Sequence, residues 1–503
     1  MEVNVLFEEV KCWSCVLDTV LRREESQESI VSDSMPDIGT VISTTATPLL
    51  RACRPGEGVV TAEGSVAAAV LYQPEGQSGV CALSLSLPFQ IQSDAPQVMP
   101  ECRLNVSARV TSAEVKLMNP RKILLRVEVA FHVLAFQSGV LRCSTGLDCA
   151  PKACMQTKME QTSFQYIAQV TEKSFPYEDA IQLTGAHRTV AALLGWSAVP
   201  YCTETKIVGS KVVFRGYAHI CMHLLGEDGQ VTSEDYDLPI SQVLDAGGAS
   251  ENARAAVSLI CTSVQLRLAE QNSVACELEF YASAILYDSR ACSVLVDAYS
   301  TACPCRAERE TETVCGQAVL GLTTVPLRCV LEQEHPVAEL VGQSVFLAEA
   351  VPAPEGGGVH CRLRASVCMR DGSGYLSTME KSCTADCAVP GLTGQNGLYS
   401  VSLLDAACVS TVSGLELRGT LSVQYIARTE IQLSRLSTVT MEQPTENDRA
   451  DQPSAVLRML RDGETLWDLG KEYYATVEDI MAVNQISDAA SAAGRFLLIP
   501  RSR

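Results

Sequence analysis

The chain has 503 residues and a net charge of −20, from 59 acidic and 39 basic residues. This charge disfavours nucleic acid or an anionic membrane as the main partner, because both would repel an acidic protein. Hydrophobic residues make up 47% of the chain and charged residues 19%, which excludes a collagen-like or globally disordered chain. No run of 18 or more apolar residues occurs, so the sequence predicts no membrane insertion.

The N-terminal residues MEVNVLFEEVKCW carry acids at Glu8 and Glu9. No apolar core follows a basic start, so they predict no secretory signal. The 22 cysteines are therefore expected in a reducing cytosol, mostly as buried thiols that behave as small hydrophobes. Cross-linking through some of them stays open for a chain that later enters an oxidising shell.

An internal repeat of about 150 residues accounts for much of the chain. The matching landmarks are Pro48 and Pro200, Gly64 and Gly216, Pro88 and Pro239, and Asp148 and Asp297. Their offsets are 152, 152, 151 and 149 residues. Because these offsets agree to within three residues, they indicate a tandem duplication.

A third, more divergent copy follows. AVLGLTTVPLR places Pro326 at the position of Pro48, and Ala388–Pro390 is aligned with Leu87–Phe89. In this alignment the third copy carries roughly 20 extra residues between Pro326 and the strand that begins near Val359.

Alternating apolar residues, as in Val127, Val129, Phe131 and Val133, are typical of half-buried strands. Glycine-rich turns such as QPEGQSG, GEDGQ and RDGSG separate these runs. Gly64 and Gly216 lie inside such runs, where a glycine marks a bulge or a close backbone approach. Short helices are expected at 156–170 and 250–256.

The predicted fold class is mainly β, with three tandem antiparallel β domains followed by a small β-α-α-β domain. The predicted boundaries are an N-terminal segment (1–29), three repeats (30–150, 175–300 and 311–440), a linker (441–454) and a C-terminal domain (455–501). The linker is expected to be flexible, because MEQPTENDRADQPS combines charges and prolines without an apolar stretch.

The C-terminal domain is predicted from local signals. Residues 456–460 and Phe496–Ile499 are expected to form strands. Thr465 and Thr476 are candidate helix N-caps, each with an aspartate three residues later, which is the spacing of a capping box. Trp467 is expected in the core or rim of this domain.

DGETLWDLGKEY, TVEDIMAVN and GRFLLIP resemble a LysM domain over residues 456–500. The resemblance implies binding of N-acetylglucosamine polymers between two loops. The implied partner- or glycan-binding residues are Asp462, Gly463, Glu464, Thr465, Leu466, Asn484, Gln485 and Ile486. Ile486 is the expected apolar anchor, on condition that it is exposed. SAAGRFLLIP departs from the family pattern, since it lacks the aromatic–proline pair before Gly494 and the glutamine after it.

The repeats and the C-terminal LysM-like domain together resemble SPOCS-domain proteins of endospore-forming bacteria. The resemblance implies a non-enzymatic protein of spore coat assembly in the mother-cell cytoplasm, at the forespore surface. It also implies that the LysM domain docks a coat-basement ATPase (SpoIVA-like). The alternative is a cell-wall or cortex-associated protein that binds peptidoglycan or a chitin-like glycan, which would need an export signal.

Catalytic and metal-binding patterns are weak. Cys12-Trp-Ser-Cys15 has dithiol spacing but no adjoining β-α-β pattern, so a structural pair is favoured. Cys303-Pro-Cys305 is interpreted as packed thiols, with zinc a lesser alternative. His219 and His223 are expected as strand histidines satisfied by the sheet. No GxSxG, HExxH or P-loop motif occurs, so we expect no enzyme activity, no catalytic residue, no metal and no cofactor.

Overall fold

The computed structural model describes residues 3–183, 189–270, 272–332, 339–354, 356–373, 375–392, 397–411, 414–442, 453–487 and 494–500. Most of the predicted linker (443–452) and the residues before the closing strand (488–493) therefore lie outside the described residues. The described part is mainly β, as predicted, with antiparallel sheets.

Three successive groups of six strands make up the body. The first is β1 (Val3–Ile30), β2 (Ile38–Gly56), β3 (Val59–Pro74), β4 (Cys81–Asp94), β5 (Arg103–Asn119) and β6 (Lys122–Cys149). The second, after a 3₁₀ turn η1 (Pro151–Ala153), is β7 (Met155–Gln182), β8 (Val190–Val208), β9 (Lys211–Gly226), β10 (Val231–Asp245), β11 (Arg254–Ala269) and β12 (Ser273–Ser300). The third is β13 (Cys305–Leu331), β14 (Glu339–Pro352), β15 (Gly358–Arg370), β16 (Leu376–Ala388), β17 (Gly397–Thr411) and β18 (Gly414–Met441). Each group begins and ends with a long strand.

The pairing within each group is the same. The three-stranded sheets β2-β3-β4, β8-β9-β10 and β14-β15-β16 each pack on the long strands of their own group. The long strands pair as β1–β6, β7–β12 and β13–β18, and β5, β11 and β17 extend them. Each group thus encloses its own apolar core between two sheets, as a β-sandwich does.

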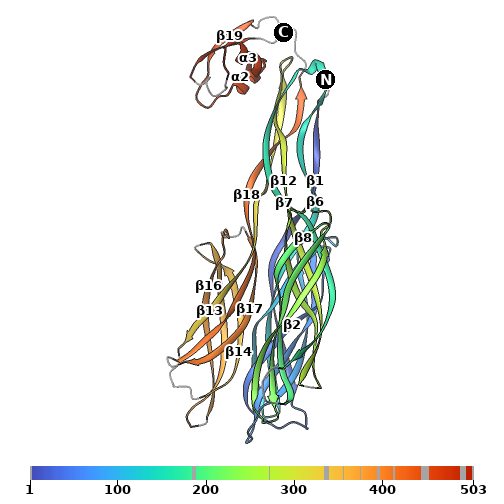
Figure 1. Ribbon diagram of the computed structural model, residues 1–503. Helices are drawn as coiled ribbons and strands as arrows, with labels where there is room; N and C mark the ends of the chain where they lie inside the picture. Colours follow the sequence, from blue (N-terminus) through green and yellow to red (C-terminus); the bar gives the residue numbers. More distant parts are fainter. Residues whose placement is uncertain are drawn as a thin grey trace.

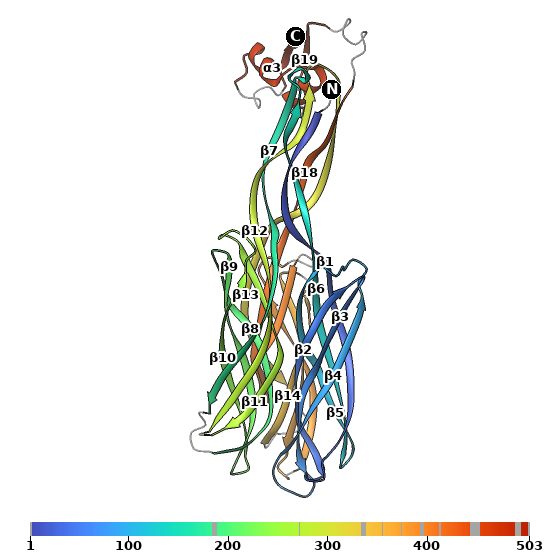
Figure 2. The same ribbon diagram turned by 90° about the vertical axis from the view of Figure 1, so that its right-hand side faces the viewer.

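The far halves of the six long strands leave the three sandwiches and run together as a stalk (Figures 1 and 2). Strands of 28 residues reach on the order of 90 Å. A register shift marks the neck in each group, with one unpaired residue at Val16, Ala168 and Gly316. Such a bulge bends and twists a strand, so three equivalent bulges redirect the three strand pairs from sandwich to stalk.

The predicted helices at 156–170 and 250–256 are wrong. Residues 156–170 lie in β7, and 250–256 form a turn that leads into β11. Phe164, Ile167 and Val170 are all buried at a three-residue spacing that resembles a helix. The bulge at Ala168 inserts one residue, so Ile167 and Val170 lie on the same face of a strand.

The N-terminal residues are not a segment apart from the first domain. β1 pairs with β6 along its length, from Val3 with Cys149 to Ile30 with Lys122. β7 and β13 take the same place in the later groups, so each structural repeat begins with a long strand that the predicted repeat boundaries left out or cut short.

The third copy is aligned differently from the prediction. Pro326 lies in the long strand β13, one strand earlier than Pro48, which lies in β2. The bulge that follows the Leu50–Gly64 pair recurs after Leu347–Leu363. Leu363 therefore takes the place of Gly64, and Ala388–Pro390 is not the equivalent of Leu87–Phe89.

The two strand glycines confirm the expected close approach. Gly64 pairs with Leu50 and Phe89, and Gly216 with Cys202 and Ile240. A Cβ atom on Gly64 would lie 2.1 Å from the Leu49 carbonyl oxygen, and one on Gly216 would lie 2.2 Å from that of Tyr201. Both positions exclude any side chain unless the backbone moves.

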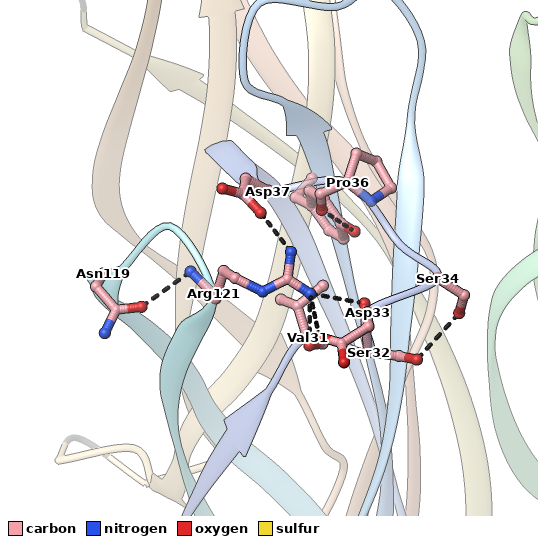
Figure 3. Close-up of polar contacts among 9 residues, drawn as sticks. Val31, Ser32, Asp33, Ser34, Pro36, Asp37, Asn119 and Arg121 are labelled. Carbon is pink, nitrogen blue, oxygen red and sulfur yellow. Dashed lines mark hydrogen bonds and ion pairs between the residues drawn. The ribbon is translucent and has the colours of Figure 1, made fainter.

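An arginine between β5 and β6 makes several polar contacts, which Figure 3 shows. Arg121, in the β5–β6 turn, pairs with Asp37 at 2.6 Å and with Asp33 at 3.3 Å. It also donates to the carbonyl oxygens of Val31 and Ser32 at 3.2 and 3.0 Å. The guanidinium thereby fastens the β1–β2 connection to the β5–β6 turn.

Candidate partner-docking site

The C-terminal module (residues 455–500) has the element order β19 (Ala455–Met459), α2 (Leu466–Tyr473), α3 (Val477–Val483) and β20 (Phe496–Pro500), with β19 paired to β20. The predicted caps are confirmed. Thr465 and Asp468 form a reciprocal capping box, and the Thr476 hydroxyl accepts a hydrogen bond from the Asp479 amide. These side chains satisfy amide donors that the first helical turn leaves unpaired.

Ile486 is not an exposed anchor. Its side chain is only 8% exposed, and it packs with Leu466, Leu469 and Leu497 in the module core. Leu466 is buried too. Both belong to the core that the two helices form against the inner face of β19–β20.

Asn484 has a structural role as well. Its amide nitrogen donates to the carbonyl oxygens of Ile480 and Leu498 at 2.7 and 2.6 Å, and its amide oxygen accepts from the Leu498 amide at 2.7 Å. These bonds join the end of α3 to β20. The predicted loops at 462–466 and 484–486 are thus connected indirectly. Leu466 and Ile486 share the module core, and Asn484 is bonded to β20.

The remaining predicted residues differ in their surroundings. Glu464 is partly buried, accepts from the Arg461 amide at 3.0 Å and pairs with Arg458 at 2.7 Å. The exposed members of the predicted set are Asp462, Gly463, Thr465 and Gln485. Gly463 has a φ of 84°, which favours glycine.

An exposed apolar face lies on the outer side of β19–β20. Leu457 pairs with Leu498, and Met459 pairs with Phe496, so all four side chains share one face of the ribbon. They are 66%, 40%, 47% and 69% exposed, respectively. An exposed group of large apolar side chains on so small a unit is typical of an interaction surface.

The opposite side of the module contacts the end of the stalk, beside which it lies in Figure 1. Asp297 of β12, only 3% exposed, accepts a hydrogen bond from the Trp467 indole nitrogen at 2.9 Å and pairs with Lys471 at 2.8 Å. Arg309 of β13 approaches the same carboxylate at 2.8 Å. Burial acts to raise the pKa of Asp297, but the hydrogen bonds from Lys471 and Trp467 and the two positive charges hold that pKa below its usual value.

Tyr299 completes this contact. Its ring meets that of Trp467 edge to face, with centroids 4.7 Å apart, and its hydroxyl donates to the Ala475 carbonyl oxygen at 2.8 Å. A Cβ on Gly470 would lie 2.5 Å from that hydroxyl oxygen, so α2 approaches closely. Burial, with the charges of Glu478 and Asp297, raises the pKa of Tyr299 to about 12.

Of the three repeats, only the second carries an aspartate and a tyrosine at the positions of Asp297 and Tyr299. Equivalent bulges skip Thr145 in β6, Val296 in β12 and Ser437 in β18. Asp297 directly follows its bulge, where the other repeats have Gly146 and Thr438.

The same register corrects one sequence landmark. Asp148, which was matched with Asp297, takes the place of Tyr299 instead. Trp467, predicted in the core or rim of its own module, lies against the stalk. No sequence pattern indicated that Asp297 and Tyr299 would receive it, because the two sides are about 170 residues apart.

A second polar cluster lies where the three sandwiches meet, around a cavity of about 280 Å³. His219 is buried there, with its Nδ1 at 3.0 Å from Asp237 and its Nε2 at 3.2 Å from Asp405 of β17. His223 contacts the Ser233 hydroxyl at 2.8 Å. Both histidines are satisfied strand residues, as predicted, although one acid comes from another repeat.

The cysteine pairs singled out in the sequence lie within or next to strands. Cys12 and Cys15 are partly buried in β1, and burial raises the pKa of the Cys15 thiol to about 11, which makes it a poor nucleophile. Cys303 is buried beside Ser300 at 3.8 Å. Among the described residues, no group of three or more His, Cys, Asp or Glu side chains is arranged to hold a metal ion.

The architecture is that of a three-repeat β protein that carries a small α/β module at the end of a stalk. Residues 37–118, which span β2 to β5 of the first repeat, match the family described as SipL, SPOCS domain. This match supports the resemblance to SPOCS-domain proteins and is consistent with a sporulation-related protein. No curated protein and no solved structure matches the chain. No helix in the described ranges is long and apolar enough to cross a bilayer.

Proposed function

We propose that this chain is a non-enzymatic spore coat assembly protein whose C-terminal LysM-like module docks a partner protein at the forespore surface, on the mother-cell side. The observation that carries the proposal is the exposed apolar face of Leu457, Met459, Phe496 and Leu498 on a module held at the far end of a stalk. The family match at 37–118 supports the sporulation context.

The stalk holds this apolar face at a distance from the sandwiches. The module is fixed by its other side, through Trp467 and Lys471, so its apolar face points away from the protein's own contacts. Burial of such a face against a partner is favourable at roughly 25 cal/mol per Å² of apolar surface.

The proposed partner is a protein with a complementary apolar surface, and the family resemblance points to a coat-basement ATPase (SpoIVA-like). The exposed residues Asp462, Gly463, Thr465 and Gln485 would contribute a polar rim, in keeping with interfaces that have an apolar centre. Leu466 and Ile486 would support the module from its core.

Peptidoglycan or chitin-like glycan binding is the second candidate. Phe496 favours it, because an exposed aromatic ring offers a stacking surface for a sugar. The other three side chains of the face are aliphatic and offer no ring. The Trp467 ring is engaged by Tyr299, and the Tyr473 ring is covered by the Arg458 guanidinium.

The test uses the full chain as a fluorescent fusion in sporulating cells. Leu457→Asp with Phe496→Asp should disperse it from the forespore surface, and deletion of 455–503 should do the same. Val483→Asp is the matched control, because Val483 is an exposed apolar residue of the same module on α3. Saturable binding of a chitin oligomer to the full chain, with localisation unchanged by the double variant, would establish the glycan function instead.

A further inference from the structure

The stalk contains a pair of cysteines from different repeats in direct contact. Cys143 of β6 and Cys292 of β12 have their sulfur atoms 3.9 Å apart, although 149 residues separate them in the chain. Both pack in one apolar cluster with Val10, Leu141 and Phe164. The two thiols are thus in direct contact, and bond formation requires their sulfurs to approach to the 2.03–2.05 Å of a disulfide.

Among the described residues, no ladder of backbone hydrogen bonds joins β6 to β12. β6 pairs with β1 and β5, and β12 pairs with β11 and β7. Between the first and second repeats, the described residues of the stalk show a single ladder pair, Trp13 with Ile167. A covalent bond between β6 and β12 would therefore join two repeats that are otherwise held here by side-chain packing, by the hydrogen bond from the Ser144 hydroxyl to the Leu295 carbonyl oxygen and by the Arg290–Glu8 ion pair.

We propose that Cys143 and Cys292 form an oxidation site that cross-links the first and second repeats through a disulfide bond. The oxidant is a peroxide. One molecule of hydrogen peroxide converts the Cys292 thiol into a sulfenic acid and releases water. The Cys143 sulfur then attacks the Cys292 sulfur, the S–S bond forms, and a second water leaves. Two thiols and one peroxide thus yield one disulfide and two waters.

The order of the two steps follows from accessibility. Cys292 is partly exposed, whereas Cys143 is buried, so the peroxide reaches Cys292 first. Burial and the neighbouring Cys292 raise the pKa of the Cys143 thiol to about 12, against which only the Arg435 guanidinium acts. The raised pKa makes Cys143 a weak nucleophile, which protects it from direct oxidation. It acts as the resolving thiol because its sulfur already lies 3.9 Å from that of Cys292.

Two more thiol pairs occur in the third repeat, Cys361 with Cys387 and Cys329 with Cys383. Each of those pairs lies within one repeat. Of these pairs, Cys143–Cys292 alone would connect two repeats, and it closes a loop of about 150 residues. In the chain-entropy treatment, a longer closed loop gives a larger stabilisation of the folded state.

The test treats the reduced full chain with hydrogen peroxide, blocks remaining thiols with N-ethylmaleimide and maps the tryptic peptides by tandem mass spectrometry. The expected product links peptide 143–152 to peptide 291–306. Fragmentation is needed because these peptides also contain Cys149, Cys303 and Cys305. The bond should lie between Cys143 and Cys292.

Two variants sharpen the result. Cys292→Ser should abolish the linked peptide. Cys12→Ser, a change in the same cluster, should leave it intact. The oxidised wild type should also melt several degrees above the reduced protein, and Cys292→Ser should lose this difference.

Recovery of Cys143 and Cys292 as maleimide adducts, under conditions that oxidise other cysteines of the chain, would overturn the proposal. So would a bond from either residue to Cys12 or to Cys149, Cys303 or Cys305. If Cys292→Ser does not fold, the peptide map of the wild type decides alone.

Discussion

Replacing Asp297 by alanine should release the C-terminal module from the stalk. The carboxylate accepts hydrogen bonds from Trp467 and Lys471 across the contact. Hydrogen bonds that involve a charged group contribute about 1.5–3 kcal/mol each, and the exposure of Lys471 reduces its share through solvent screening. We therefore expect a loss of about 2–4 kcal/mol in docking free energy, or roughly 30- to 1,000-fold in the docked-to-undocked ratio.

Trp467 reports this change directly. The chain has three tryptophans, so Trp13→Phe and Trp196→Phe leave Trp467 as the single emitter. In Asp297→Ala its emission should shift to the red and its quenching by acrylamide should increase, because the indole loses its contacts with Asp297 and Tyr299. Asp148→Ala is the matched control, an exposed aspartate at the equivalent level of the first repeat. Equal quenching of Trp467 with and without Asp297 would refute the reasoning.

The same contact has a defined pH dependence. The pKa of Asp297 is depressed in the docked state. In acid, the docked state therefore binds fewer protons than the undocked state. The stabilisation is fully present above the ordinary carboxyl pKa of about 3.8, and it is lost as the pH falls through the lower docked value. Trp467 quenching should therefore be constant near neutral pH and should rise only in acid below about pH 4.

Four further changes test the fold. Gly216→Val should destabilise the chain by about 3 kcal/mol, since its Cβ would meet the Tyr201 carbonyl oxygen. Leu363→Val, at the equivalent position of the third repeat, should cost about 1 kcal/mol in the same chemical denaturation assay. Ile486→Arg should unfold the C-terminal module, seen as loss of amide protection in α3, whereas a purely local loss of partner binding would contradict its burial. Arg121→Ala should lower the melting midpoint by a few degrees, equivalent to about 1–3 kcal/mol, and an unchanged midpoint would show that its carbonyl and carboxylate contacts add nothing.

The sequence alone determined the features that depend on neighbouring residues. Alternation of apolar residues indicated strands because a strand exposes successive side chains to opposite faces. Thr465 and Thr476 located the starts of α2 and α3, since a cap bonds only three residues ahead. Gly64 and Gly216 indicated close backbone approaches, because a Cβ is excluded at the position itself.

Only the tertiary structure decided which strands and side chains meet. One extra residue at Ala168 gave a strand the spacing of a helix, and the third repeat could be aligned only through its bulges. Ile486 belongs to the core, and Trp467 lies against Asp297 and Tyr299. The physical reason is that ladder register and burial depend on partners elsewhere in the chain, from Leu497 near Ile486 to Asp297, 170 residues before Trp467. A local pattern shows that a side chain can be buried or paired, but it does not show against what.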